Sequence, residues 1–345
     1  MACKPILPLM LAALLTSGPA WADVVRIASW GGVVSDANRI AYWAPYEKET
    51  GTKIVEDTFN GEIAKARAQV EAGMYQWDIA EMEDAEAVTG CEEGLYEKLD
   101  LSRLPIADLL PNTYNDCGIV SLTSGTGLAY NKAKLPNGPQ TWADFFDTGK
   151  FPGKRGLRKS ATITLEIALL GAGVPKEDVY TTLATKEGQD KAFAMLDSIK
   201  DHIVWWSSGT ELIQGFLSEE FDIAVAYNGR IGAANKTQGQ ELEFVWNADY
   251  LIGNNQWVIL KDSPNAAAAM NFIAWATAPE HQAEFMRHID YASANSKAFT
   301  LLEPQYLTYM PNTAERVKFG IPPNVAVWRD NLDSLTERFN SWASE

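Results

Sequence analysis

Short β-branched runs alternate with helix-length stretches in this chain, and this alternation limits the fold more than any other feature. In the first part, strands are expected at 24–29, 53–57 and 77–82, with helices between them at 36–50 and 62–72. Pro45 lies inside the first helix and should kink or split it. Strands that alternate with helices of about 10–15 residues indicate βαβ units and a mostly parallel sheet. The sequence therefore predicts an α/β fold.

The same pattern returns later in the chain and indicates a second α/β unit. A strand beginning at 155, a helix at 164–172 and a strand at 221–227 form this second series. The chain has 345 residues, which exceeds the roughly 250–300 residues at which a single core stops growing. We therefore expect two lobes, joined by crossovers near 121–130 and 250–259.

These crossovers divide the chain between the lobes. The first lobe is expected to contain 23–126 and about 256–310, and the second 127–255 and about 311–345. The last segment contains a helix whose apolar residues recur at spacings of four and three, which is typical of a helix packed on a core. These residues are Trp328, Leu332, Leu335, Phe339 and Trp342. We expect this face to make core or lobe contacts rather than ligand contacts.

The N-terminus has the three parts of a secretory signal peptide. Lys4 supplies a positive charge, residues 5–15 form an apolar run, and Ala20-Trp21-Ala22 ends the segment with two small residues. The run is shorter than the roughly 20 apolar residues that span a bilayer. A signal peptide at 1–22 predicts a mature chain that begins at Asp23 and works in the periplasm.

The chain is acidic, with a formal net charge of −16 that becomes −17 if Lys4 is removed with the leader. Such a charge disfavours nucleic acid and anionic lipid as partners and suits neutral or cationic ones. A generally acidic surface exposed to solvent explains most of this negative charge equally well, without any particular partner.

Two cysteines, Cys91 and Cys117, remain once the leader with Cys3 is removed. Two thiols in an exported chain predict one disulfide. The chain has only three histidines, and no Cys or His spacing resembles a set of metal ligands. We therefore expect neither a metal nor a cofactor.

Ligands of doubly wound sheets bind at the carboxyl ends of strands, where loops lead into helices. Four segments at expected strand ends supply the candidate residues, which are Trp30 and Gly31; Glu81, Glu83 and Asp84; Trp206 and Ser207; and Tyr227, Asn228 and Arg230. Aromatic rings and carboxylates suit a primary amine, through cation–π contacts and charge-assisted hydrogen bonds. Each residue alone is equally well explained as a core aromatic or a solvated acid. Their shared position at strand ends favours a ligand site.

Several segments resemble the periplasmic substrate-binding components of ABC importers, in the spermidine/putrescine-binding group. These segments are ASWGG at 28–32, CEEGLYEKLD at 91–100, TWADFFD at 141–147, WWSSG at 205–209, YNGRI at 227–231 and SPNAAAAMNFIAWATAPEHQAEF at 263–285. The resemblance implies a two-lobe type II periplasmic-binding fold with a ligand cleft between the lobes. It also implies a monomer that closes on its ligand, docks on an ABC permease and catalyses no reaction.

The resemblance also bears on individual residues of the cleft. Trp30 and Tyr227 match aromatic positions that sandwich the polyamine in that group. Asn255 stands where polyamine binders tend to carry an aspartate, and Gly253 where they carry a tryptophan. A neutral asparagine is a weaker partner for an ammonium than a carboxylate is.

Other charged residues of the chain could compensate for this difference. Glu81, Glu83 or Asp84 could supply the missing negative charge, and Arg230 or Lys159 could pair with a ligand carboxylate. The sequence therefore leaves three kinds of ligand open, namely a polyamine, a zwitterion such as a γ-amino acid, and another polar solute such as an amino acid, an opine or a metal ion.

Two rival classes of protein find little support in the residues. An exported hydrolase could use Ser124 or a pair formed by Glu81 and Glu83, but no G-x-S-x-G elbow surrounds any serine. A ferric-ion binder of the same fold would need clustered Tyr, His and Asp side chains, and only Tyr227 lies at the expected cleft. The sequence favours a binding protein over an enzyme.

Overall fold

The computed structural model describes residues 23–307 and 309–345 of the chain. The predicted signal peptide at 1–22 lies outside the described residues. Within the described ranges, no helix has both the length and the apolar composition needed to cross a membrane.

One mixed sheet runs through the molecule in the strand order β2-β1-β3-β9-β4-β7-β5-β6. Its strands are β1 Val24–Ser29, β2 Lys53–Thr58, β3 Ile79–Glu83, β4 Gly118–Asn131, β5 Arg155–Arg158, β6 Ile203–Trp206, β7 Ile223–Tyr227 and β9 Tyr250–Ile259. Two short strands join it, β8 Leu242–Phe244 beside β4 and β10 Gly320–Ile321 beside β9. The outer strands pair in parallel, whereas β4 and β9 are antiparallel to each other in the middle.

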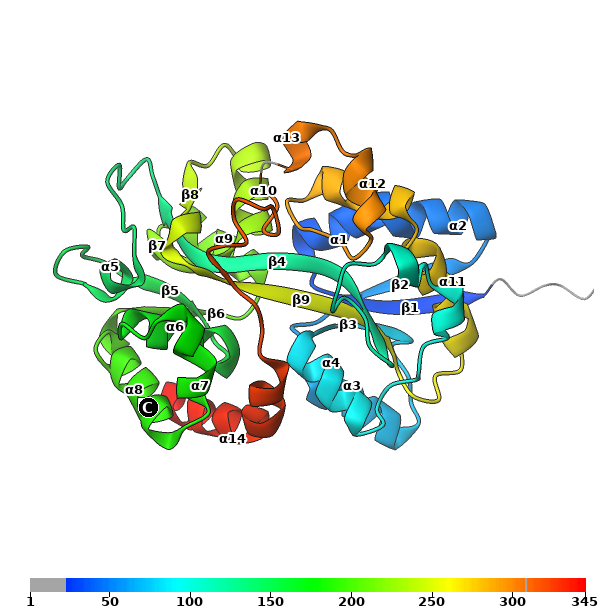
Figure 1. Cartoon of the computed structure of the whole chain (residues 1–345), viewed down its shortest axis with the longest axis horizontal. Helices are drawn as coiled ribbons and strands as arrows, with labels where there is room; N and C mark the ends of the chain where they lie inside the picture. The colour runs from blue at the N-terminus through cyan, green and yellow to red at the C-terminus, as the bar shows by residue number, and fades with distance from the viewer. Residues whose placement is uncertain (1–22, 308) are drawn as a thin grey trace, which may run out of the picture.

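Helices surround this sheet on two sides of the molecule (Figure 1). They are α1 Gly32–Asn38, α2 Ala44–Thr50, α3 Ile63–Ala72, α4 Asp84–Glu92, α5 Trp142–Phe146, α6 Ala161–Gly171, α7 Val179–Leu183, α8 Lys186–Asp197, α9 Gly209–Leu217, α10 Asn228–Gln238, α11 Ala266–Ala276, α12 Pro279–His288, α13 Pro304–Leu307 and α14 Val325–Ser344. We call the part with β1–β3, α1–α4, α11 and α12 the β1 side, and the part with β5–β7 and α5–α10 the β7 side.

The two long strands β4 and β9 connect the β1 side to the β7 side (Figure 1). One end of β9 pairs with β3, and the far end of β4 pairs with β7. Both expected crossovers therefore exist, but they are continuous strands rather than loops, since each backbone is hydrogen-bonded to the other along most of its length. The predicted α/β fold with two lobes is confirmed, and the assignment of residue ranges to each lobe stays a prediction.

The C-terminal helix α14 packs against both sides of the molecule, because it contacts α4 on one side and α6 and α7 on the other. Its apolar face is buried as predicted, with Trp328, Leu332, Leu335 and Phe339 in one core cluster and Trp342 packed at its edge. This helix therefore forms part of the contact between the two sides.

Pro45 splits the first helix, as its sequence position predicts. A π-helical turn at Arg39–Trp43 separates α1 from α2, and Ala44 N–H donates to the carbonyl of Arg39 instead of the residue four back. Proline has no N–H to continue the regular pattern. The helix also begins at Gly32, four residues earlier than expected.

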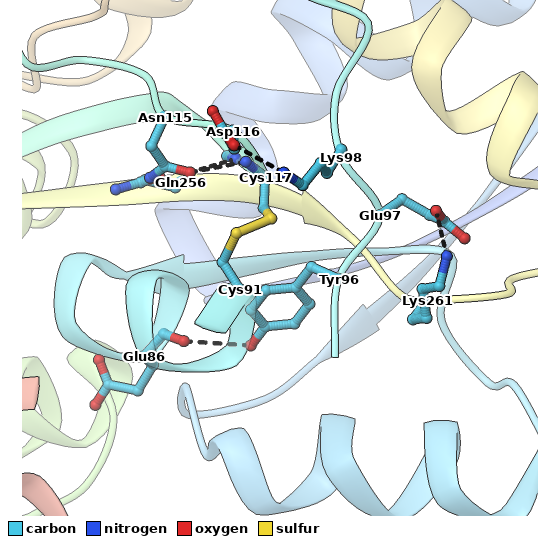
Figure 2. Close-up of a disulfide and its surroundings, with 11 residues drawn as sticks. Glu86, Cys91, Tyr96, Glu97, Lys98, Asn115, Asp116, Cys117, Gln256 and Lys261 are labelled. Carbon is cyan, nitrogen blue, oxygen red and sulfur yellow. Dashed lines mark hydrogen bonds and ion pairs between the residues drawn. A yellow bond between two sulfur atoms is a disulfide. The ribbon is translucent and has the colours of Figure 1, made fainter. Parts of the chain in front are cut away.

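The predicted disulfide joins Cys91 at the end of α4 to Cys117 just before β4, with 5.8 Å between their Cα atoms (Figure 2). Asn115 fixes the chain beside it, since its Oδ1 accepts from the Cys117 N–H at 2.9 Å and its Nδ2 donates to Gln256 at 2.7 Å. The disulfide thus anchors α4 to the start of a crossing strand.

Replacing Cys91 and Cys117 together by serine should lower the free energy of unfolding by about 3 kcal/mol, since the link closes a loop between residues 26 apart. Urea unfolding of the oxidised protein, the reduced protein and the double variant measures this. The reduced protein and the variant should agree. A loss below about 1 kcal/mol would contradict a stabilising role for the link.

Candidate ligand-binding cleft

A cleft opens between the β1 side and the β7 side, with an empty volume of about 950 Å³ including its mouth. This volume is near the upper end of the range of about 300–1,000 Å³ for small-molecule sites. Residues from both sides and from the crossing strands β4 and β9 line it.

Five strands direct their carboxyl ends into this cleft. Trp30 follows β1, Glu83 ends β3, Arg158 ends β5, Ser207 follows β6, and Tyr227 ends β7, and all five residues line the cleft. Parallel strands on each side place these ends at the same edge, so residues distant in sequence meet there.

The structure brings together seven of the eleven predicted ligand residues at the cleft wall. These are Trp30, Glu83, Asp84, Ser207, Tyr227, Arg230 and Asn255. The other four lie behind the wall and are Gly31, Glu81, Trp206 and Asn228.

Each of these four has a structural explanation. Glu81 is buried and accepts hydrogen bonds from Ser29 Oγ at 2.6 Å and Trp257 Nε1 at 3.1 Å. The side chain of Asn228 accepts from the Gly125 N–H at 2.8 Å and so holds α10 against β4.

Trp206 and Gly31 have structural roles as well. Trp206 packs edge-on against Tyr227, with 5.5 Å between the ring centroids. Gly31 has a φ of 66°, and a Cβ there would lie 2.7 Å from a Thr58 methyl. The turn into α1 therefore needs glycine at this position.

Arg230 lines the cleft. It lies in the first turn of α10, is only 4% exposed, and donates from Nη2 across the cleft to the Trp30 carbonyl at 3.2 Å. Gly32 and Gly209 leave room for the guanidinium, because a Cβ at either position would collide with it. Among residues 23–307 and 309–345, no carboxylate lies within ion-pair distance of Arg230.

Arg158 and Glu83 both line the cleft and form an ion pair, at 2.6 Å between Nη1 and Oε1. Arg158 comes from the β7 side and is 6% exposed, while Glu83 comes from the β1 side. Burial alone would lower the pKa of Arg158, but the Glu83 carboxylate raises it above its ordinary value. The pair therefore links the two sides as a charged contact.

Asp84 begins α4, lines the cleft and is 8% exposed. Gln256 Nε2 donates to its Oδ1 at 2.6 Å and Asn254 Nδ2 to its Oδ2 at 3.0 Å, so both carboxylate oxygens are oriented. Burial raises the pKa of Asp84 to about 6, and these two amides offset only part of that effect.

Two further carboxyl groups, Glu86 and Glu166, line the same region. Burial raises the pKa of Glu86 to about 8 and that of Glu166 to about 7. The cleft lining therefore holds the guanidinium of Arg230 and several carboxyl groups in addition to the Arg158–Glu83 pair. Tyr227 feels charges of both signs, because Arg158, Glu83 and Arg230 all influence its pKa, which burial raises.

Sequence reasoning missed several residues of the cleft, and two of them had a usable signal. Arg158 ends a strand that was expected to begin at 155, so the strand-end rule would have selected it. Glu166 is the single acid in the apolar stretch TLEIALLG at 164–171, where a charge requires an explanation. Trp328 was assigned to a core, and it lies both in that core and at the cleft wall.

The helix that carries Glu166 has an unusual start. Thr162 and Ile163 are not helical within α6, and Ile163 has a φ of 74°, which is rare for a β-branched residue. The regular part of the helix therefore begins at Thr164, where the sequence predicted it.

The family model described as bacterial extracellular solute-binding protein matches residues 41–310. This match covers well over half of the chain. The chain belongs to this family. Its members are binding proteins of transport systems, so the protein is a solute-binding component and not an enzyme.

Relatives within and near this family bind small nitrogen-containing solutes, according to their names. The gamma-aminobutyric acid-binding protein of Pseudomonas aeruginosa is 38% identical over 333 residues, which cover 96% of this chain and 94% of the relative. The putrescine/agmatine-binding protein of the same species is 24% identical over 332 residues, covering 87% of this chain and 88% of the relative.

Two solved structures from Agrobacterium tumefaciens share the fold closely. The binding protein AgtB, in complex with agropinic acid, gives a TM-score of 0.87 at 32% identity and covers 94% of this chain and 99% of its own. The binding protein MotA, in complex with glucopine, gives 0.88 at 32% identity, with coverage of 92% and 99%.

Raising the pH should destabilise the protein through its buried carboxyl groups. Burial raises the pKa of Glu166 from 4.5 to about 7, so its stabilising contribution is complete below about 4.5 and is lost as the pH rises through 7. Between pH 5 and pH 8, the wild type should lose about 2 kcal/mol more unfolding free energy than Glu166→Gln, at about 1.4 kcal/mol per pH unit.

Urea unfolding of both proteins at the two pH values measures this difference. Lys186→Gln serves as the control, because this lysine lies on the exposed face of α8 and should follow the wild type. If the unfolding free energies of the wild type and Glu166→Gln change equally with pH, this would contradict the raised pKa of Glu166.

Proposed function

We propose that the protein is a periplasmic binding component that captures a small zwitterion of the γ-amino-acid type and delivers it to an ABC permease. The observation that carries the proposal is the buried guanidinium of Arg230 at the cleft wall, which has no carboxylate within ion-pair distance among the described residues. The identity of 38% with a gamma-aminobutyric acid-binding protein supports the same ligand class.

Arg230 suits a ligand carboxylate. A buried guanidinium without an anionic partner is unfavourable, and a carboxylate can accept two parallel hydrogen bonds from it. Because Arg230 already reaches the Trp30 carbonyl on the β1 side, a carboxylate bound there would contact groups on both sides of the cleft.

Asp84 suits the ligand ammonium. Its two oxygens are oriented by Asn254 and Gln256, and an ammonium beside it would favour the ionised form that burial opposes. Trp30 and Tyr227 would add aromatic surface for the aliphatic part and the cation.

A diamine fits this arrangement less well than a zwitterion. Its second ammonium would meet Arg230, and like charges in a buried cleft repel each other strongly. The Arg158–Glu83 pair does not change the net charge of the cleft lining, since its two charges cancel.

Closure would follow from contacts that the ligand makes with both sides. A ligand that binds the closed form more tightly shifts the population toward it. The crossing strands β4 and β9 provide the continuous backbone around which the two sides would move. The permease would then receive the closed, loaded form.

A larger carboxylated solute such as an opine is a second candidate. The volume of about 950 Å³ exceeds what a γ-amino acid needs, and two close structural neighbours hold agropinic acid and glucopine. Arg230 could take the carboxylate in either case.

A thermal-shift panel of γ-aminobutyrate, putrescine, spermidine, amino acids and sugars tests the ligand class. γ-Aminobutyrate at about one hundred times its Kd should stabilise the protein by about 2.7 kcal/mol, while the diamines leave the melting temperature unchanged. Stabilisation by putrescine alone would overturn the zwitterion proposal.

Arg230→Gln should weaken binding of γ-aminobutyrate at least tenfold, because a charge-assisted pair is worth about 1.5–3 kcal/mol. Lys236→Gln is the matched control, since Lys236 lies on the same helix but pairs with Asp290. Calorimetric titration measures both. Equal affinities of the two variants for γ-aminobutyrate would show that Arg230 does not bind the ligand.

A further inference from the structure

The cleft lining holds more acidic groups than one ligand ammonium requires. In the proposed function, which this inference extends, Asp84 takes that ammonium. Glu83 is already paired with Arg158 at 2.6 Å. Glu86 and Glu166 remain without a cation within ion-pair distance in the described part of the chain.

Glu166 is built into the wall by α6 and α14. It is 2% exposed, and Trp328 Nε1 donates to its Oε1 at 2.6 Å. Its Oε2 is buried and makes no hydrogen bond to any residue in the described ranges. Glu166 and Trp328 both line the cleft, so the indole orients a carboxyl whose second oxygen has no hydrogen-bond partner within the described residues.

Glu86 lies in the first turn of α4 on the opposite side of the cleft. Its Oε2 is also buried and without a hydrogen bond within the described residues. Its backbone carbonyl accepts from Tyr96 Oη at 3.5 Å, whereas its side chain points away from the disulfide (Figure 2). Residues of α4 and α6 thus place one unsatisfied carboxyl oxygen each on the two sides of one cleft.

The surrounding groups do not neutralise these two carboxyls. Glu83 and Asp84 lie close to Glu86 and raise its pKa further, while Arg158 only partly opposes them because it is paired with Glu83. Around Glu166, Trp328 and the backbone N–H groups at 163 and 166 only partly offset burial. Glu83 raises the pKa of Glu166 further, and Tyr180, another neighbour of Glu166, is a neutral phenol held protonated by burial. A buried carboxyl of this kind is stabilised when a cation pairs with it.

We propose that Glu86 and Glu166 form a second cation subsite, so that the protein also binds amino acids that carry a cationic tail. The carboxylate of such an amino acid would lie at Arg230 and its cationic tail between Glu86 and Glu166. Its α-ammonium, on the same carbon as the carboxylate, would lie against the rings of Trp30 and Tyr227. A guanidinium or ammonium tail would donate to the two free oxygens, which a neutral tail would satisfy less well.

Arginine and citrulline form a matched pair for the test, since they share the amino-acid group and differ by a charged guanidinium against a neutral ureido group. Calorimetric titration of the wild type should give a Kd at least tenfold lower for arginine. In the Glu86→Gln, Glu166→Gln double variant, the Kd values of citrulline and arginine should differ by less than twofold. Far-ultraviolet circular dichroism and thermal melting establish that the variant is folded.

A second measurement uses only the wild type. Binding of arginine near pH 7 should release protons, because the cation favours the ionised form of both carboxyls, whereas citrulline should release fewer. Titrations in two buffers with different ionisation enthalpies give the number of protons directly.

Equal affinities for arginine and citrulline in the wild type, or no binding of either, would overturn the second subsite. Equal proton release with the two ligands would overturn it as well. These outcomes leave the proposed function intact as long as γ-aminobutyrate binds, whereas loss of γ-aminobutyrate binding in the wild type contradicts the proposed function itself.

Discussion

The antiparallel pairing of β4 with β9 is the constraint on which the rest of the structure depends. These two strands carry the hydrogen bonds that join β3 on one side to β7 on the other. Their pairing fixes the register between Glu83 and Asn255 and between Thr126 and Tyr227, so the cleft wall forms from both sides at once. Without this pairing, the sheet would not fix the strand ends of the β1 side relative to those of the β7 side.

Fixed strand ends allow the cleft to hold charges that would otherwise be too costly to bury. Arg158 meets Glu83 only because β5 and β3 end facing each other across the cleft. Arg230 is placed by the first turn of α10 and by the absence of side chains at Gly32 and Gly209. A buried ion pair adds little net stability, but loss of one partner leaves an expensive unpaired charge. The charges are therefore better explained by ligand selection than by stability.

Much of this arrangement could be predicted from local patterns. The βαβ alternation, the break at Pro45, the disulfide and the buried face of α14 all follow from interactions between residues that are close in sequence or from cysteine pairing. The strand-end rule also placed Trp30, Glu83, Asp84, Ser207, Tyr227 and Arg230 at the cleft wall. These features depend on secondary structure alone.

What the sequence could not provide is the direction of side chains relative to the wall. Glu81 and Glu83 differ by two positions in one strand, yet Glu81 bonds to Ser29 and Trp257 behind the wall while Glu83 reaches Arg158. Glu81 lies within β3 opposite Trp257, whereas Glu83 is the last residue of the strand. Similarly, Trp328 and Glu166 meet only through the packing of α14 on α6, at a separation of 162 residues.

Such long-range contacts determine which ligand the cleft prefers, while local patterns determine only that a cleft exists. Within residues 23–307 and 309–345, no element brings a carboxylate within ion-pair distance of Arg230 or a cation within that distance of Glu166. Both conditions depend on which side chains the fold brings close to Arg230 and Glu166, and no short sequence motif encodes that. Relatives named for binding gamma-aminobutyric acid or putrescine/agmatine, and neighbours in complex with agropinic acid or glucopine, agree with the general rule that one fold can carry sites for different ligands.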